Sequence, residues 1–158
     1  MDTRTVNNIK GSNYQIFALT LIISFIVMYC IMFLNVDEAD HIYLSMTRIY
    51  MTLMMVAAMA LLMIATMGKM YKNKRINLMI VIIGITVFGL SLAGVRTQTL
   101  IGDVQYMKGM IPHHSIAILT SKNAHIKDPE VRKLADGIIA TQEKEIAEMK
   151  AILARINK

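Results

Sequence analysis

Three stretches of this chain contain no charged residue, and they constrain the fold more than any other feature. They run from Gly11 to Val36, from Ile49 to Gly68 and from Ile76 to Val95. About 20 apolar residues are enough for a helix to cross the hydrocarbon core of a bilayer. The first stretch is too long for the core of a signal peptide and has no small-x-small cleavage site. The sequence therefore predicts three retained transmembrane helices, at about residues 14–34, 49–68 and 76–95.

The loops between these stretches differ in charge, which indicates how the chain crosses the membrane. The loop from Asn35 to Arg48 contains three acidic residues and one Arg, whereas the loop from Lys69 to Arg75 contains four basic residues and no acidic one. Cytoplasmic loops gather Lys and Arg. The second loop and the N-terminus are therefore predicted to be cytoplasmic. We expect a three-span domain over 1–96, embedded in membrane lipid, and an extracytoplasmic domain over 97–158.

Charge and cysteine content limit the classes of partner and site. The formal net charge is +6, and part of it is the cytoplasmic loop charge that sets the orientation. The sequence has no basic stripe with stacking aromatic residues, so no nucleic-acid partner is expected. The single cysteine, Cys30, rules out an intramolecular disulfide and a Cys-x-x-Cys metal site.

The segment after the third stretch has the pattern of two helices, over residues 98–123 and 128–157. Asp128 is placed to cap the second helix and Pro129 to occupy its first position. Pro112 lacks a backbone N–H and is expected to kink the first helix. Because only a short turn separates the two helices, we predict an antiparallel hairpin.

The second helix of this hairpin has more apolar surface than one partner helix can cover. Its apolar stripe comprises Val131, Leu134, Ala135, Ile138, Ile139, Ile146, Met149, Leu153 and Ile156. A domain of about 55 residues is marginally stable without a metal or oligomerisation. We therefore predict an all-α fold in which hairpins pair into a four-helix bundle as a homo-oligomer, with Ile138 and Ile146 among the contacts.

Two thioethers and two imidazoles lie within two helical turns in the segment Met107-Lys-Gly-Met-Ile-Pro-His-His114. Positions 103, 107, 110 and 114 share one face of a helix, and polar groups on such a seam are costly unless bonded or coordinating. Thioether is a poor ligand for magnesium, calcium or manganese, so the donors favour monovalent copper. The candidate ligands and orienting residues are Asp103, Met107, Met110, His113, His114, Gln142, Glu145 and Met149.

These residues also have ordinary structural interpretations. Methionine commonly fills gaps in a core, and His, Gln and Glu can form a buried polar network that fixes helix register. His125 in the turn is a weaker candidate ligand, and His41 in the first outer loop is weaker still. In the second span, methionines recur every four residues from Met51 to Met67. Packing explains this methionine ladder more simply than a chain of thioethers that passes copper across the bilayer.

The hairpin segment resembles a known family. The residues that carry the resemblance are Asp103, Tyr106-Met107, Met110-Ile-Pro-His-His-Ser-Ile-Ala-Ile118, Asp128-Pro129, Leu134-Ala135, Ile138-Ile139, Gln142, Glu145-Ile146 and Met149. From about Gly102 to Leu153 the chain is similar to the bacterial family known as domain of unknown function 305. The resemblance implies a ferritin-like helical domain and, as for some members, periplasmic copper binding and tolerance.

The sequence and this resemblance together predict a membrane-anchored metal-binding protein of the bacterial cytoplasmic membrane, with its hairpin in the periplasm. It would buffer copper(I) or pass it to other copper-handling proteins, and no enzymatic activity is expected. One alternative is an assembly module whose polar network holds no metal. A ferritin-like di-iron oxidoreductase is less favoured, because the chain has no Glu-x-x-His motif.

Overall fold

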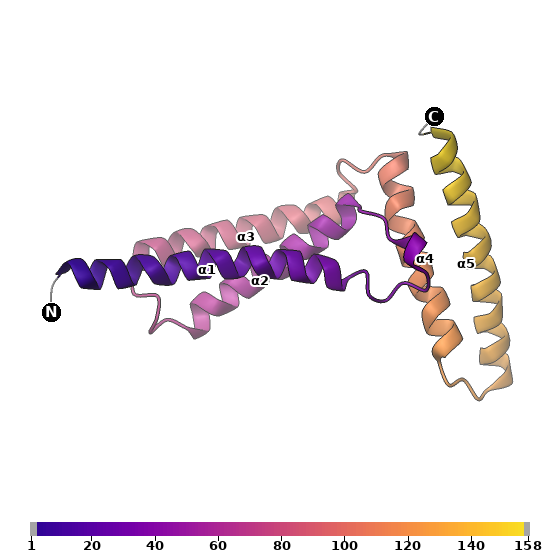
Figure 1. The fold of residues 1–158 in the computed structure, drawn as a ribbon, viewed down its shortest axis with the longest axis horizontal. Coiled ribbons are helices and arrows are strands. Elements are labelled where there is room, and N and C mark those ends of the chain that lie inside the picture. Colours follow the sequence, from indigo (N-terminus) through magenta and orange to yellow (C-terminus); the bar gives the residue numbers. More distant parts are fainter. Residues whose placement is uncertain (1–2, 157–158) are drawn as a thin grey trace. The chain divides into compact units, whose positions relative to one another are not determined.

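The computed structural model describes residues 3–156, including the side chains of residues 13–156, and all of its regular segments are helical (Figure 1). The described residues contain no strand, which confirms the predicted all-α class. The elements are α1 (Thr3–Ile31), the short 3-10 helix η1 (Ala39–His41), α2 (Met46–Thr66), α3 (Lys74–Thr97), α4 (Asp103–Asn123) and α5 (Pro129–Ile156).

Helices α1, α2 and α3 are long and apolar enough to cross a membrane, as predicted. The candidate spans are Asn13–Ile31, Met46–Thr66 and Lys74–Thr97. Most of their side chains are not covered by protein, as expected of helices that face lipid. The α3 helix begins where the Asn73 side chain accepts hydrogen bonds from the backbone N–H groups of Arg75 and Ile76, at 3.0 and 3.2 Å. Such a cap satisfies two of the donors that a helix N-terminus leaves unpaired.

Small residues on α3 allow α2 to approach it closely. A Cβ atom added at Gly84 would lie 2.9 Å from Cδ2 of Leu61, and one added at Gly94 would lie 3.1 Å from the Tyr50 ring. Small residues at helix contacts are typical of transmembrane packing, where close van der Waals contact replaces the hydrophobic effect. A side chain at either position would therefore displace Leu61 or Tyr50 of α2.

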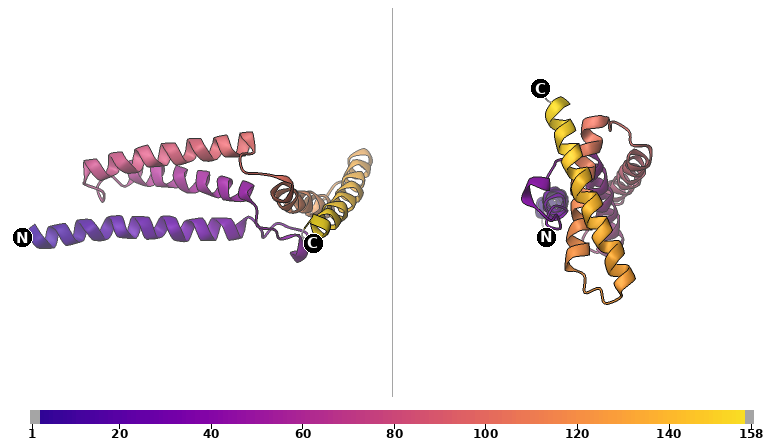
Figure 2. Two further views of the ribbon diagram at one scale, coloured as in Figure 1. Left: turned by 90° about the horizontal axis from the view of Figure 1, so that it is seen from above. Right: turned by 90° about the vertical axis from the view of Figure 1, so that its right-hand side faces the viewer.

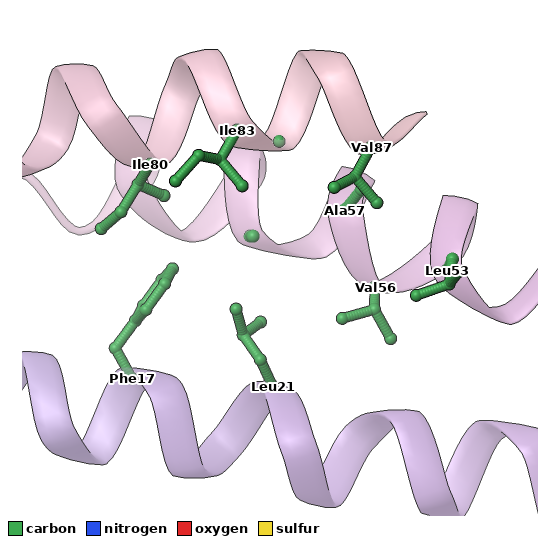
Figure 3. A pocket seen from close by; sticks show the side chains of 10 residues that line it. Phe17, Leu21, Leu53, Val56, Ala57, Ile80, Ile83 and Val87 are labelled. Atoms are coloured by element: carbon green, nitrogen blue, oxygen red, sulfur yellow. The ribbon is translucent and has the colours of Figure 1, made fainter. Parts of the chain in front are cut away.

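The methionine ladder of α2 does not line the apolar hollow between the three spans. This hollow has a volume of about 210 Å³, and no methionine is among the described residues around it. Figure 3 shows Phe17 and Leu21 from α1 pointing toward Ile80 and Ile83 from α3. Met51 and Met55 are exposed, whereas Met63 packs against the cluster around Phe17. Along the ladder, the methionines thus pass from exposed positions to a packed one. This favours the interpretation that they serve in packing and do not pass copper across the bilayer.

The first helix of the hairpin begins later than predicted. We expected it to start at Gln98, but α3 ends there and α4 starts at Asp103. Gln98 has φ 53° and Leu100 has φ 61°, so both lie in the left-handed region. A left-handed residue is a common helix terminator, and without glycine as a signal the break is hard to recognise in the sequence.

Helices α4 and α5 form the predicted antiparallel hairpin and lie side by side in Figures 1 and 2. Asp128 caps α5 as expected, because its Oδ1 accepts hydrogen bonds from the backbone of Glu130 and Val131 at 2.9 and 3.0 Å. The α4 helix continues through the buried Pro112. The hairpin core consists of Met107, Ile111, Ile118, Ile146 and Leu153.

One residue predicted to contact a second hairpin lies instead inside this one. Ile146 is only 3% exposed and packs in the α4–α5 core, so its assignment to the assembly surface was wrong. Ile138 is 37% exposed and Leu134 is 65% exposed. The apolar stripe of α5 is therefore divided, and its exposed members Val131, Leu134, Ile138 and Ile156 form an outer set together with the exposed Ile152. We call this set the outer stripe.

The loop between α1 and α2 belongs with the hairpin. The chain forms two compact units, one containing α1 through Tyr29 with Ile49–Thr99, the other containing Cys30–Arg48 with the chain from Leu100 onward. The sequence-based division placed this loop in the domain over 1–96. In the structure, the backbone N–H of Asp37 donates to Ser115 Oγ at 2.7 Å, and that of Met46 donates to Gln105 Oε1 at 3.0 Å. These contacts join the loop to α4.

Candidate metal centre

His114 and Glu145 face each other across the hairpin. The distance from His114 Nδ1 to Glu145 Oε2 is 3.1 Å, and Gln142 Nε2 donates to the same oxygen at 3.4 Å. Gln142 and Glu145 share a face of α5 because residues three apart on a helix are neighbours. Sequence reasoning assigned all three to one site, and the structure brings them together.

The His114 imidazole is buried and incompletely bonded. Its side chain is 13% exposed, and Nδ1 has no hydrogen-bond partner among the described residues. Although Glu145 Oε2 is close, it does not lie in the direction that a ring N–H would need. Burial lowers the pKa of His114, and the neighbouring His113 lowers it further, whereas Glu145 opposes the shift. The neutral imidazole, which is the form that coordinates metals, is therefore favoured.

Two thioethers lie one turn from this pair, one on each helix. Met110 precedes His114 by four residues on α4, and Met149 follows Glu145 by four residues on α5. Because the helices are antiparallel and His114 faces Glu145, these two steps lead to the same level of the hairpin. Met149 packs against the core cluster that contains Met107. The hairpin thus places imidazole, carboxylate and thioether donors at adjacent levels.

Other predicted site residues lie outside this group. Asp103 is exposed in the first turn of α4, and its separation of eleven positions from His114 corresponds to roughly 16 Å of helix. His113 is exposed, with its ring centroid 6.1 Å from that of His114. His125, in the turn, is also exposed. Among the eight predicted residues, Asp103 is therefore the one that the fold separates most clearly from His114.

Sequence reasoning ranked His41 as the weakest candidate ligand and did not predict the polar cluster that it forms with α4. Ser115 Oγ lies 2.9 Å from Nδ1 of the buried His41. Lys122 Nζ lies 2.8 Å from Asp37 Oδ2, which raises the pKa of Lys122. Lys150 Nζ lies 2.5 Å from Asp40 Oδ2, and this hydrogen bond holds the pKa of Asp40 below its usual range. The concentration of acids around His41 was the available signal, but nothing in the sequence paired it with Ser115.

The fold and this cluster define a class of protein: an all-α chain in which three candidate membrane spans accompany a polar helical hairpin. Residues 103–158 match the family described as Domain of unknown function (DUF305). The chain belongs to this family, as its resemblance in the hairpin segment suggested. The match begins at the first residue of α4, so it coincides with the hairpin as the structure defines it.

A relative of similar length extends the likeness beyond the hairpin. The chain is 38% identical over 144 residues to "Uncharacterized protein L153" of Acanthamoeba polyphaga mimivirus. The alignment covers 89% of this chain and 93% of the relative. An alignment of this length includes much of the three-span region. The relative is viral, whereas the family resemblance in the sequence suggested a bacterial protein. No solved structure matches the chain.

Proposed function

We propose that the hairpin binds monovalent copper between α4 and α5, and that the protein buffers this ion or transfers it to other copper-handling proteins. The observation that carries the proposal is the buried, unbonded Nδ1 of His114, 3.1 Å from Glu145 Oε2. An unsatisfied buried nitrogen destabilises the fold unless something else binds it. A metal ion that binds the lone pair of His114 Nδ1 would satisfy this nitrogen in place of a hydrogen bond.

The donors fit a soft ion. Nitrogen and oxygen ligands lie about 2.0–2.2 Å from an ion such as zinc, so two ligands of one tetrahedral ion are roughly 3.3 Å apart. The observed separation of 3.1 Å is compatible with a shared ion. Met110 and Met149 add thioethers at the next level, and these favour copper(I) over harder cations. His113 and Gln142 would orient or complete the site.

The test is anaerobic copper(I) titration of the full chain in detergent, with competition by a copper(I)-specific chelator. His114→Ala is expected to lower the affinity by at least about 10-fold, because it removes a ligand at the centre of the site. His125→Ala is the matched control, since His125 is exposed in the turn, and it should bind as the parent does. A parent protein that takes up no copper would overturn the proposal.

The same contacts support a second candidate function, an assembly module without metal. Gln142, Glu145 and His114 form a continuous polar group at the α4–α5 seam. Such a group can fix the register of packed helices at some expense of stability. This candidate predicts that the parent binds no copper(I). The di-iron alternative has less support, because the carboxylates of Asp103 and Glu145 lie at different levels of the hairpin.

The proposal places the hairpin on the extracytoplasmic side of the cytoplasmic membrane, which is the periplasm if the host is bacterial. The support is the loop charge: the segment Lys69–Arg75 between α2 and α3 is basic, whereas Asp37, Glu38 and Asp40 lie between α1 and α2. The acidic loop packs on the hairpin, so the two share one side of the membrane. An extracytoplasmic position also suits a site built without thiols.

A reporter fused after Lys158 is expected to be active only if it matures outside the cytoplasm, because three spans carry the chain from a cytoplasmic N-terminus across the membrane. An alkaline phosphatase fusion measures this directly in cells. A fusion in the basic loop, after Lys72, is the matched control and should be inactive. The reverse pattern of activity would invert the topology and remove the extracytoplasmic site.

Copies of the hairpin also associate in this proposal. The outer stripe leaves five large apolar side chains of α5 exposed, and a hairpin of this size gains stability by covering such a surface. Two hairpins that meet along their outer stripes would build the four-helix arrangement of a ferritin-like bundle. The homo-oligomer would keep one candidate copper site within each hairpin.

A further inference from the structure

The loop between α1 and α2 contains a second cluster of metal-ligating groups, separate from the α4–α5 seam. At its centre is His41, which is only 5% exposed. Its Nδ1 lies 2.9 Å from Ser115 Oγ, which also accepts a hydrogen bond from the backbone N–H of Asp37. Ser115 therefore holds the imidazole ring in one orientation, as the residues behind a metal-bound histidine commonly do.

The other ring nitrogen of His41 faces two carboxylates. His41 Nε2 is 3.7 Å from Glu38 Oε2 and 3.6 Å from Asp40 Oδ1, beyond hydrogen-bond range. Within the described part of the chain, this nitrogen has no hydrogen bond. When Nδ1 donates its proton to Ser115, the lone pair of Nε2 is directed at the carboxylates. The largely buried ring thus presents a nitrogen lone pair to two potential co-ligands.

The space and the charge beside His41 suit a cation. A hollow of about 210 Å³ is lined by Asp37, Glu38, His41, Glu143 and Lys150, together with apolar residues of α4 and α5. Lys122 contacts Asp37 and Glu143, and Lys150 contacts Asp40. Four carboxylates, those of Asp37, Glu38, Asp40 and Glu143, thus surround two ammonium groups. Glu38 has no lysine or arginine partner among the described side chains. The excess negative charge matches a divalent ion.

We propose that Glu38, Asp40 and His41 bind a divalent transition-metal ion of the borderline class, such as Zn²⁺. Their ligand atoms all lie within 4.8 Å of one another, so small side-chain movements bring them to about 2.0–2.2 Å from one ion. Imidazole with carboxylates and no thioether is a ligand set that zinc accepts and copper(I) does not favour. Lys150 contacts Asp40 Oδ2, which leaves Oδ1 for the ion. Bound metal would fasten the loop to Ser115 and α4.

This site does not depend on the copper(I) proposal, because it contains no sulfur donor and uses none of the same residues. Its position is nevertheless close, since Ser115 follows His114 directly on α4. Consecutive residues of a helix are about 100° apart, so the two sites would lie on different faces of α4. They would also select ions by donor chemistry, with soft ions at the site that contains thioethers and borderline divalent ions at the site in the loop.

Zn²⁺ titration of the full chain in detergent, after removal of metals with a chelator, tests the proposal. The parent is expected to bind one Zn²⁺ that Glu38→Gln weakens by at least about 10-fold, because a carboxylate ligand becomes a neutral amide. Glu38 is exposed and its side chain contacts Asp40 and His41 of the same short loop, so this variant should fold normally. Glu148→Gln, at an exposed carboxylate on α5, is the matched control and should bind as the parent does.

X-ray absorption of the zinc-loaded protein provides a second readout. A shell of nitrogen and oxygen atoms with one imidazole and no sulfur supports the assignment, and His41→Gln should remove the imidazole contribution. Glu38→Gln should leave copper(I) affinity unchanged. Equal Zn²⁺ affinity of the parent and Glu38→Gln, or a shell that contains sulfur or two imidazoles, would overturn the proposal.

Discussion

Replacement of Met110 and Met149 together by leucine is expected to lower the copper(I) affinity of the full chain by at least about 100-fold, because two soft donors disappear from the candidate site. Leucine preserves volume and apolarity, so the cost to folding should stay below about 1.5 kcal/mol. Met110 is half-buried on α4, and Met149 is half-buried on α5, where it packs against the hairpin core. The double substitution therefore removes sulfur and little else.

Competition titration with a copper(I) chelator under anaerobic conditions measures this affinity. The chain offers a matched control in Met51→Leu with Met55→Leu, which removes two exposed thioethers from α2. That variant should bind copper(I) at the hairpin as the parent does. If the hairpin double variant keeps the parental affinity, Met110 and Met149 serve only as packing, and the copper proposal loses its main chemical support.

The second large effect is expected at Ile146. An aspartate there would place a carboxylate among Met107, Ile111 and Leu153 with no partner, and buried unpaired charges belong to the most destabilising class of substitutions, about 4 kcal/mol or more. A core of this size supplies only about 3–5 kcal/mol. Ile146→Asp should therefore unfold the hairpin, as measured by loss of helical circular dichroism and by proteolysis between α4 and α5.

Leu134→Asp combined with Ile138→Asp is the matched test of the outer stripe. Both side chains are exposed on α5, so the hairpin should keep its helical content while self-association weakens. Light scattering of the detergent-solubilised chain gives the mass of the assembly. A folded variant with the same oligomeric mass as the parent, or a parent that is monomeric, would contradict the proposed pairing.

Much of the fold was predictable because its signals are local. A run of some 20 uncharged residues has few outcomes other than a membrane span, and the described spans agree with the predicted ones to within a few residues. Asp128 followed by Pro129 indicated the start of α5, because the side-chain cap and the fixed φ of proline both act on the neighbouring backbone. The break at Gln98 and Leu100 was missed because neither residue type favours positive φ.

The site was predictable to the extent that it depends on helical periodicity. The spacing of Met110 and His114 on α4, and of Glu145 and Met149 on α5, determines that each pair shares a face. Antiparallel packing then brings His114 to Glu145. Asp103 satisfied the same periodicity and still lies apart, because residues on one face of a long helix can be several turns from each other.

By itself, the sequence determined the three spans, the hairpin and the faces of its helices, since these follow from composition, capping residues and a period of 3.6. Only the tertiary structure decided which element covers each face. It placed Ile146 inside the hairpin and left Ile138 half exposed, although both belong to one apolar stripe. It also brought His41 to Ser115, which lies 74 residues away in the chain. Such contacts depend on how whole elements pack, and local periodicity carries no information about them.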